Sequence, residues 1–348
     1  MNSMVALSLV ASMSIGIAPQ QPAAPVWTAT ADTGVTARLR GLSPVSDNVA
    51  WASGSAGAVL RTIDGGTSWQ SVGPANTVDL QFRDIEAFDA FNAVILAIGP
   101  GEASRVYRTT DGGTTWTETF RNLDENAFYD CMAFLDKRHG LALSDPVDGK
   151  FRILSTVDGG ASWKVNPTDG MPAALEGEFA FAASGTCLVT AQKGSGRDYW
   201  FATGGGATAR VFHSTNRGRS WSVNDSPVPS GPSAGIYSLA FRDPRHGLAV
   251  GGDFVTPDTA PDGSAVSNDG GRTWTVTATI PDEYRSGASW LPWTSRTALA
   301  VGPTGSDITF DGGRTWVRFD TSSLDSVACV DRTCWGSGAN GRVVKFLR

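Results

Sequence analysis

The sequence of 348 residues has few of the side chains that metal binding and catalysis most often use. It contains three histidines and four cysteines, and no two cysteines have Cys-x-x-Cys spacing, so we expect no zinc site and no other cofactor. The net charge of −6 argues against nucleic acid and against an anionic membrane surface as partners. Beyond the N-terminus no apolar run reaches roughly 18 residues, so we expect no membrane-spanning helix.

The N-terminus carries the longest apolar stretch of the chain. Residues 4–18 resemble the apolar core of a signal peptide, although no Lys or Arg precedes them. We expect residues 1–25 to be a signal peptide with a short tether, and residues 26–348 to form a single domain. The sequence therefore predicts a periplasmic or secreted protein.

Glycine is abundant, with 41 residues, and much of it lies in six copies of the pattern Ser/Thr-x-Asp-x-Gly-x-Ser/Thr-Trp. The third positions of the copies are Asp64, Asp111, Asp158, Asn216, Asp269 and Asp311. These positions are 42 to 58 residues apart, and residues with high strand propensity flank each copy. A repeat of this length with β-type flanks is typical of a β-propeller.

Each copy has the features of a tight turn between two strands. Glycine adopts positive φ at little steric cost, and the Asp carboxylate can accept hydrogen bonds from backbone N–H groups further along the turn. A second repeat, Ala133–Leu143 and Ala240–Val250, precedes the turn and predicts two further strands. We therefore expect four antiparallel strands per unit, with the six Asp or Asn residues in structural roles.

A seventh unit runs from Leu324 to Phe346 and ends without the turn and without a fourth strand. Val26–Thr30 has the pattern of the missing strand, including Trp27. The sequence therefore predicts an all-β, seven-bladed β-propeller in which the N-terminal strand completes the last blade. Closure removes the exposed sheet edges of an open stack. We expect a monomer with almost no helix.

The repeated turn resembles the Asp-box (BNR repeat) of the sialidase-like superfamily. The Asp-Gly-Gly-x-Thr-Trp form, the His-Gly-Leu-Ala-Val strand before it and the single-domain length resemble the photosystem II stability/assembly factor-like propellers. The resemblance covers Trp27 to Phe346 and implies the fold more specifically than the function, because such propellers include hydrolases, assembly factors and receptors. Members of the assembly-factor family bind a membrane-protein precursor through a polar patch, and no basic cluster in this sequence matches that patch.

A sialidase needs three arginines for the substrate carboxylate and an Arg-Ile-Pro element in its first blade. The Arg-Ile-Pro element is absent, and no motif places Arg40, Arg83 and Arg285 together at the channel. We therefore expect no true sialidase activity.

Ligands of propellers usually bind around the channel mouth on the face opposite the Asp-box turns. Aligning the first strands of the blades puts Arg40 level with Asp84 and Cys131, and puts Arg83, Asp130 and Tyr237 one residue earlier. The catalytic candidates on this face are Asp130, Asp145, Glu178 and Asp253. The ligand-binding candidates are Arg40, Arg83, Asp84, Tyr237, Arg285, Asp307, Trp290 and Trp293.

These side chains fit several roles. Two carboxyl groups cleave a glycosidic bond in glycoside hydrolases, and their separation sets the stereochemistry. Asp145, Asp148, Asp253 and Asp307 carry the oxygen ligands that Ca²⁺ prefers. Alternatively, Arg–Asp pairs only tie the blades together. Trp290 and Trp293 form either a sugar-stacking or protein-contact surface, or part of the core.

The cysteines divide into two pairs. Cys329 and Cys334 flank a short hairpin turn and are placed to form a disulfide. Cys131 and Cys187 fall in the first strands of adjacent blades and either form a bridge or are separate buried residues.

The sequence as a whole favours an exported binding or assembly module for a protein or glycan ligand at the channel mouth. The alternative is a glycoside hydrolase or lyase that uses carboxylates on the same face. A channel mouth filled by the loop 251–265 would argue against the hydrolase.

Overall fold

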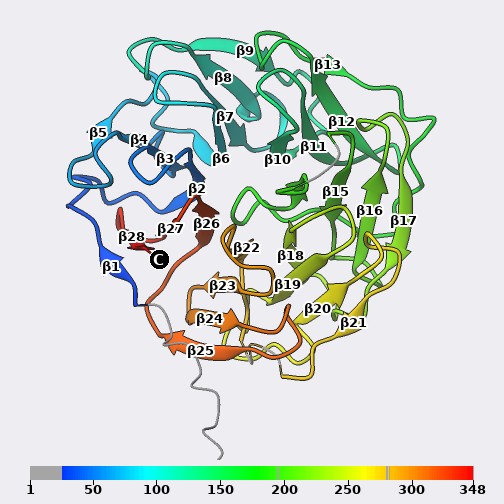
Figure 1. The fold of residues 1–348 in the computed structure, drawn as a ribbon. Helices are drawn as coiled ribbons and strands as arrows, with labels where there is room; N and C mark the ends of the chain where they lie inside the picture. The colour runs from blue at the N-terminus through cyan, green and yellow to red at the C-terminus, as the bar shows by residue number, and fades with distance from the viewer. Residues whose placement is uncertain (1–25, 194–195, 280, 282, 348) are drawn as a thin grey trace, which may run out of the picture.

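The computed structural model describes residues 26–193, 196–279, 281 and 283–347, and the expected signal peptide lies outside these residues. Seven four-stranded antiparallel sheets surround a central axis (Figure 1). Among the described residues the one helical element is the 3-10 turn η1 (Gly101–Ala103), and no helix is long and apolar enough to cross a membrane. The predicted all-β, seven-bladed propeller is confirmed.

Each blade runs from an inner strand at the channel to an outer strand at the rim. Blades 1 to 3 consist of β2 (Leu39–Pro44), β3 (Ala50–Gly54), β4 (Val59–Thr62) and β5 (Gln70–Ser71); β6 (Gln81–Ala87), β7 (Ala93–Ile98), β8 (Arg105–Thr109) and β9 (Thr117–Arg121); and β10 (Tyr129–Phe134), β11 (Gly140–Val147), β12 (Lys150–Thr156) and β13 (Lys164–Val165).

Blades 4 to 7 follow the same order, and the outer strand of blade 7 comes from the N-terminus. They consist of β14 (Leu188–Val189), β15 (Tyr199–Ala202), β16 (Arg210–Ser214) and β17 (Ser222–Asp225); β18 (Ala234–Phe241), β19 (Gly247–Asp253), β20 (Ser264–Ser267) and β21 (Thr275–Val276); β22 (Gly287–Trp290), β23 (Ala298–Gly302), β24 (Gly305–Thr309) and β25 (Val317–Asp320); and β26 (Ser326–Val330), β27 (Thr333–Ser337), β28 (Val343–Leu347) and β1 (Thr28–Ala29).

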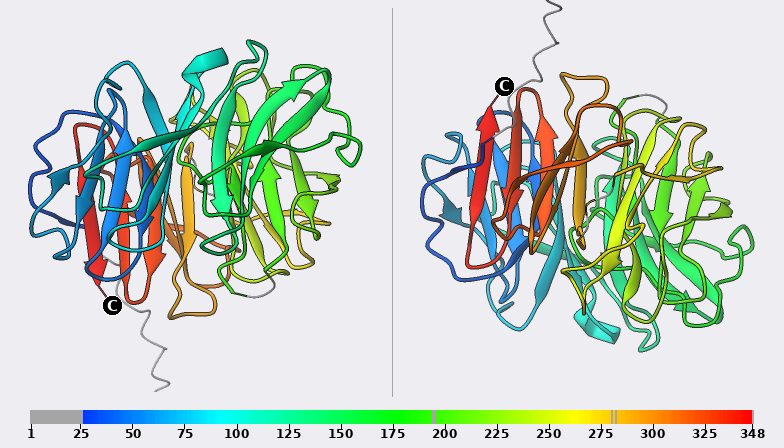
Figure 2. Two further views of the ribbon diagram at one scale, coloured as in Figure 1. Left: turned by 90° about the horizontal axis from the view of Figure 1, so that it is seen from above. Right: turned by 90° about the horizontal axis from the view of Figure 1, so that it is seen from below.

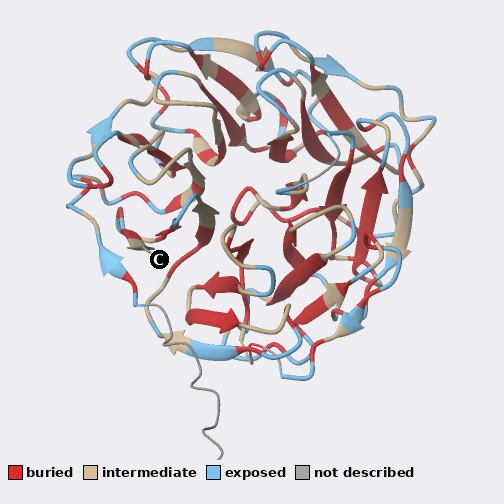
Figure 3. Ribbon diagram, viewed as in Figure 1, coloured by how far each residue is buried: buried red, intermediate tan, exposed pale blue. Residues whose placement is uncertain are grey.

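The seven inner strands form a closed ring, because each contacts the next and β26 contacts β2. Seen edge on, the ring is a thick disc whose strands run between its two faces (Figure 2). Burial falls from the middle strands to the rim, where β1, β5 and β13 are exposed (Figure 3). The core therefore lies between neighbouring blades.

The N-terminal strand closes the ring as predicted. Thr28 pairs with Lys345, and Ala29 pairs with Val344. The Trp27 side chain is 9% exposed, packs against Phe346 with ring centroids 5.2 Å apart, and donates a hydrogen bond to Ser306 Oγ in blade 6 at 3.1 Å. Trp27 thus joins the last blade to its neighbour.

The Asp-box turns connect the third and fourth strands of blades 1 to 6. In the first copy Asp64 accepts hydrogen bonds from the Ser68 backbone N–H at 2.9 Å and the Ser68 hydroxyl at 2.6 Å. Thr62 donates to Asp64 and accepts from the Gly66 N–H, each at 2.9 Å. These hydrogen bonds, led by those from Ser68, lower the pKa of Asp64 to about 2. The Asp64 carboxylate is therefore engaged in hydrogen bonds within its own turn, which is a structural role.

The fourth copy departs from the other five at two positions. Asn216 replaces the aspartate, and Arg217 stands where the other copies have a glycine of φ between 73° and 87°. Arg217 adopts φ 64°, a conformation that costs a non-glycine residue on the order of 1 kcal/mol. The turn therefore keeps its shape at a cost in backbone strain.

Both cysteine pairs form disulfides. Cys329 and Cys334 are joined as expected across the turn between β26 and β27. Cys131 and Cys187, whose state the sequence left open, are also joined, and this bridge links the inner edges of blades 3 and 4.

We expect Trp27→Ala to lower the free energy of unfolding by about 3 kcal/mol, because it removes a buried aromatic side chain from the closing strand. Denaturant unfolding followed by circular dichroism measures the change. Val26→Ala is the matched control, because Val26 is 76% exposed. Equal midpoints for the two variants would contradict the role of Trp27 in closure.

Candidate functional site

A shared β-bulge aims one residue at the channel mouth from the inner strand of four blades. The register of the inner strand shifts at this point in blades 1, 2, 3 and 5. A bulge leaves one residue unpaired and redirects its side chain. The bulged residues are Arg40, Arg83, Asp130 and Tyr237. The sequence alignment of Arg40 with Asp84 and Cys131 was wrong by one residue, because a bulge cannot be counted before the pairing is known.

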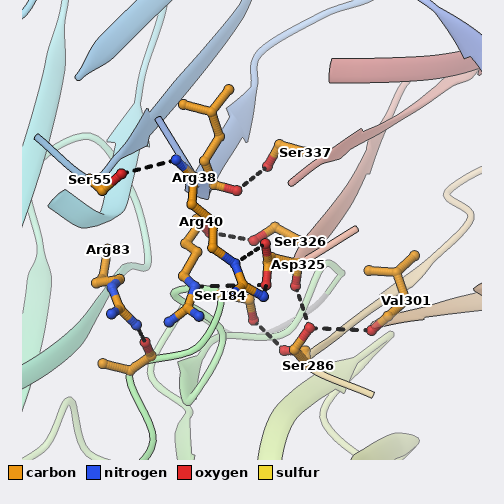
Figure 4. Close-up of polar contacts among 12 residues, drawn as sticks. Arg38, Arg40, Ser55, Arg83, Ser184, Ser286, Val301, Asp325, Ser326 and Ser337 are labelled. Atoms are coloured by element: carbon orange, nitrogen blue, oxygen red, sulfur yellow. Dashed lines mark hydrogen bonds and ion pairs between the residues drawn. The ribbon is translucent and has the colours of Figure 1, made fainter. Parts of the chain in front are cut away.

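An arginine cluster occupies the mouth beside blades 1 and 2 (Figure 4). Arg38 forms a bidentate salt bridge with Asp325, with Nε–Oδ2 and Nη2–Oδ1 distances of 2.8 and 2.7 Å. The Arg40 Nε lies 3.7 Å from the same carboxylate and has no hydrogen-bond partner among the described residues. Arg38 and Arg40 thus share one carboxylate, and Arg83 adds a third guanidinium group to the cluster.

Arg83 helps to hold a loop across the mouth. Its Nη1 donates to the Ala182 carbonyl at 2.7 Å, and the Asp145 carboxylate accepts from the Ala180 N–H at 2.8 Å. Further along, Ser184 donates to the Ser286 carbonyl at 2.6 Å. Residues 179–186 are therefore fastened to blades 2, 3 and 6, and Figure 1 shows this part of the chain, in green, near the central axis.

Gly185 is the residue at which this loop passes closest to blade 2. A Cβ at this position would lie 2.5 Å from Asp84 Oδ1, and φ is +77°. Only glycine fits both requirements. The loop across the mouth is thus the one before blade 4, and the loop 251–265 contributes Phe254 to the lining of the same mouth.

Aromatic side chains form a second wall at the channel mouth. Phe181 stacks on Tyr237 with ring centroids 3.8 Å apart, and Tyr284 meets Tyr237 edge-on at 4.7 Å. The Tyr237 hydroxyl donates to the Ser233 carbonyl at 2.6 Å, so its polar end is satisfied within the protein. This wall offers apolar contact to a ligand.

Two aspartates in blade 3 form a coupled pair. Asp130 is 2% exposed, and both burial and the neighbouring Asp145 carboxyl raise its pKa well above the ordinary value. Burial also raises the pKa of Asp145 to about 7, while the hydrogen bonds from the Ala180 N–H and from Asp130 act in the opposite direction. Both shifts favour the protonated carboxyl group, and Asp130 is the more deeply buried of the two.

The arginine cluster, the aromatic wall and the aspartate pair line one cavity of about 540 Å³. Of the sequence-predicted candidates, it brings together Arg40, Arg83, Asp130, Asp145 and Tyr237. Arg38, Asp325, Tyr284 and the loop residues were missed. Arg38 is two residues before Arg40, and side chains at this spacing point to the same face of a strand. The sequence therefore contained a signal for Arg38.

Glu178, Arg285 and Asp307 form ion pairs inside the protein and are not among the residues that line this cavity. The Arg210 Nε donates to Glu178 at 2.8 Å, and the Thr203 hydroxyl donates at 2.6 Å. The Arg285 Nε donates to Asp307 at 2.6 Å, and the Arg285 side chain is 1% exposed. These residues tie strands and loops within their blades.

Asp84 joins blades 2 and 3. It accepts from the Met132 N–H at 2.6 Å, and burial raises its pKa to about 8. Asp253 accepts from the Val255 N–H at 2.8 Å in its own loop and is not a cavity-lining residue.

The tryptophan pair is not at the mouth. Trp290 is 2% exposed and donates to the Ala240 carbonyl at 3.0 Å, so the hypothesis that it is a sugar-stacking surface is wrong. Trp293 packs edge-on against Phe346 with centroids 6.4 Å apart. Trp290 ends β22 and Trp293 lies in the connection to β23, so both belong to the turn between the first and second strands of blade 6.

Metal binding gains no support from the described part of the chain. No group of three or more His, Cys, Asp or Glu side chains gathers there. Of the four aspartates considered for Ca²⁺, Asp145 and Asp148 belong to blade 3, Asp253 to blade 5 and Asp307 to blade 6.

The mouth also differs from a glycoside hydrolase site. In such an enzyme both members of the Asp130 and Asp145 pair would have to reach a sugar, but Asp130 is 2% exposed. The loop 179–186 covers this pair through Ala180. The site therefore has the features of a binding cavity with charged and aromatic walls.

Two solved structures of similar fold are structures of YCF48. A structure of YCF48 bound to D1 peptide superimposes with a TM-score of 0.65 at 14% identity, covering 95% of this chain and 97% of that chain. YCF48 from Cyanidioschyzon merolae gives 0.58 at 16% identity, covering 93% and 99%. No protein-family model and no curated protein matches the sequence. The expected resemblance to assembly-factor propellers is thus confirmed at the level of the fold.

The aspartate pair predicts a dependence of stability on pH. A carboxyl group whose pKa is raised by folding contributes stability below the unfolded pKa of about 3.9, and that stability is lost as the pH rises through the folded pKa. For Asp145 this window runs from about pH 4 to about pH 7. As the pH rises across this window, we expect the free energy of unfolding to fall less steeply for the double variant Asp130→Asn/Asp145→Asn than for the wild type. The difference in slope should be roughly 1 kcal/mol per pH unit.

Urea unfolding at several pH values tests this prediction. Asp253→Asn is the control, because its amide can still accept the loop hydrogen bond to Val255. Parallel pH profiles for the wild type and the double variant would contradict it.

Proposed function

We propose that this propeller is a binding module that takes an acidic segment of a protein ligand into the cavity at the channel mouth. The observation that carries the proposal is the arginine cluster, in which Arg38 and Arg40 share the Asp325 carboxylate and Arg83 lines the same cavity. A carboxylate ligand supplies the charge that the cluster lacks.

The arginines have capacity left for a ligand. The Arg38 side chain is 42% exposed despite its contact with Asp325, and Arg40 is only partly covered. Guanidinium groups bind carboxylates through paired, directional hydrogen bonds, and these strengthen where water is partly excluded. The mouth meets this condition because the loop 179–186 and the aromatic wall border it.

The aromatic wall supports a peptide as the ligand. Phe181, Tyr237 and Tyr284 lie in the same cavity as the arginines. A peptide segment carries acidic groups beside apolar side chains, so it suits both walls at once. The YCF48 of similar fold was solved with a bound D1 peptide, which supports the same class of ligand for this chain.

We further propose that the protein acts outside the cytoplasm. The two disulfides fit an oxidising compartment. The apolar residues 4–18 fit export through a signal peptide.

The test compares peptide binding by the full chain and by the variants Arg40→Gln and Arg40→Lys. We expect Arg40→Gln to weaken binding of acidic peptides about tenfold and to flatten its salt dependence, because one charged contact is lost. Arg40→Lys should recover part of the affinity through its charge. Isothermal titration against peptides selected from a display library measures both effects.

Arg296→Gln is the control, since Arg296 is exposed beside the box turn of blade 6 on the opposite face. An equal loss of peptide affinity in this control would overturn the proposed function. Binding to glycans but not to acidic peptides on an array would overturn it as well.

A further inference from the structure

The six box turns of this chain provide an internal comparison, and copy four stands apart from the other five in charge. Asn216 makes the same contacts as the aspartates: its Oδ1 accepts from the Ser220 N–H at 3.0 Å and from the Ser214 hydroxyl at 3.0 Å, and its Nδ2 donates to the Ser220 hydroxyl at 2.7 Å. The turn therefore holds its shape without a negative charge.

Arg217 changes the charge further in the same direction. It stands where the other copies have glycine, and it adopts the same left-handed backbone conformation, with φ 64°. Its backbone N–H donates to the Arg197 carbonyl at 3.0 Å, and its side chain is exposed. Strained backbone of this kind clusters at functional sites, so it motivates a hypothesis about the Arg217 side chain.

Two more arginines complete a basic hollow at this turn. A hollow of about 160 Å³ is lined by Arg197, Asn216, Arg217 and Arg219. Among the described residues, none of the three guanidinium groups makes a hydrogen bond or an ion pair. The nearby Asp198 is buried, and its carboxylate contacts His213 Nε2 at 2.9 Å.

A larger hollow adjoins this one. It has a volume of about 530 Å³, lies between blades 3 and 4, and shares Arg217 and Arg219 with the small hollow. Its walls include the apolar faces of Leu141, Pro167 and Tyr199, and its acidic residue is Asp169. A charged group in the small hollow would therefore have room beside it for an attached organic part.

We propose that the copy-four turn is a binding site for a phosphate group carried on an organic molecule. Three unpaired guanidinium groups suit a doubly charged oxyanion, and the planar fork of arginine pairs with phosphate oxygens through two parallel hydrogen bonds. The net charge of the chain is −6, so this hollow is a local reversal of sign. The site lies on the box-turn face and is independent of the proposed function at the channel mouth.

The phosphate has two sources, a free phosphate ester or the headgroup of an anionic lipid, and the experiment separates them. One arm titrates the full chain with inorganic pyrophosphate and with glycerol phosphate by calorimetry at low salt. The other arm measures co-sedimentation with vesicles of phosphatidylcholine with and without phosphatidylglycerol. Binding in the first arm alone identifies a free ester, and binding to the phosphatidylglycerol vesicles alone identifies a headgroup.

The decisive variant is Asn216→Asp/Arg217→Gly, which restores the pattern of the other copies. It removes backbone strain, so we expect it to fold at least as stably as the wild type while losing phosphate affinity about tenfold. Arg272→Thr is the matched control, because Arg272 occupies the position of Arg219 in copy five beside a charged Asp269. We expect the phosphate affinity of that control to fall by less than about twofold.

Three results would overturn the proposal. They are binding in neither arm, equal affinity of the wild type and the restored variant, and equal loss in the Arg272→Thr control. Peptide binding at the channel mouth, measured on the same preparations, should be unchanged by Asn216→Asp/Arg217→Gly, which keeps the two sites distinguishable.

Discussion

The antiparallel pairing of β1 with β28 is the constraint on which the rest of the molecule depends. It gives blade 7 its outer strand, and the contact of β26 with β2 then closes the ring of inner strands. In a closed ring every inner strand has a neighbour on both sides, so no blade can shift without disturbing two others. The channel mouth is thus built from seven separate parts of the chain that the closure holds at fixed positions.

Closure also explains how the mouth can carry so many charged side chains. The inner strands converge there, and the bulge in four of them delivers Arg40, Arg83, Asp130 and Tyr237 to one level. Charges brought this close must be paired, hydrogen bonded or neutralised. Asp325 pairs with Arg38, whereas burial raises the pKa of Asp130 and so favours its neutral form. Arg40 and Arg83 retain capacity, which is why the ligand proposed for the mouth is acidic.

The fold could be predicted from the sequence because its signals are local and repeated. Each box turn specifies its own hairpin through side-chain contacts within seven residues, as Asp64 and Ser68 illustrate. Trp27 could be assigned to blade 7 because it repeats the tryptophan of those turns. The Cys329–Cys334 bridge was equally local.

The site was harder to predict because its contacts are long-range. The partner of Arg38 is Asp325, at the other end of the chain, and no pattern within the repeat connects them. The loop 179–186 breaks the repeat, so its path across the mouth depends on contacts such as Arg83 to Ala182 and Ser184 to Ser286. Glu178 and Arg285 resembled site residues in sequence, but ion pairs within the protein engage them.

The box turns show how a repeat can vary its charge while its architecture stays the same. What the turn requires at its third position is an oxygen acceptor for backbone N–H groups, and an amide oxygen meets this need as a carboxylate does. The charge is therefore free to change between copies without loss of the hairpin. Five copies keep the aspartate, whereas copy four has Asn216 in its place, beside three arginines whose guanidinium groups have no protein partner among the described residues. Because structure alone demands neither the loss of the carboxylate nor the strain at Arg217, the cause is best sought in what approaches that turn from solvent.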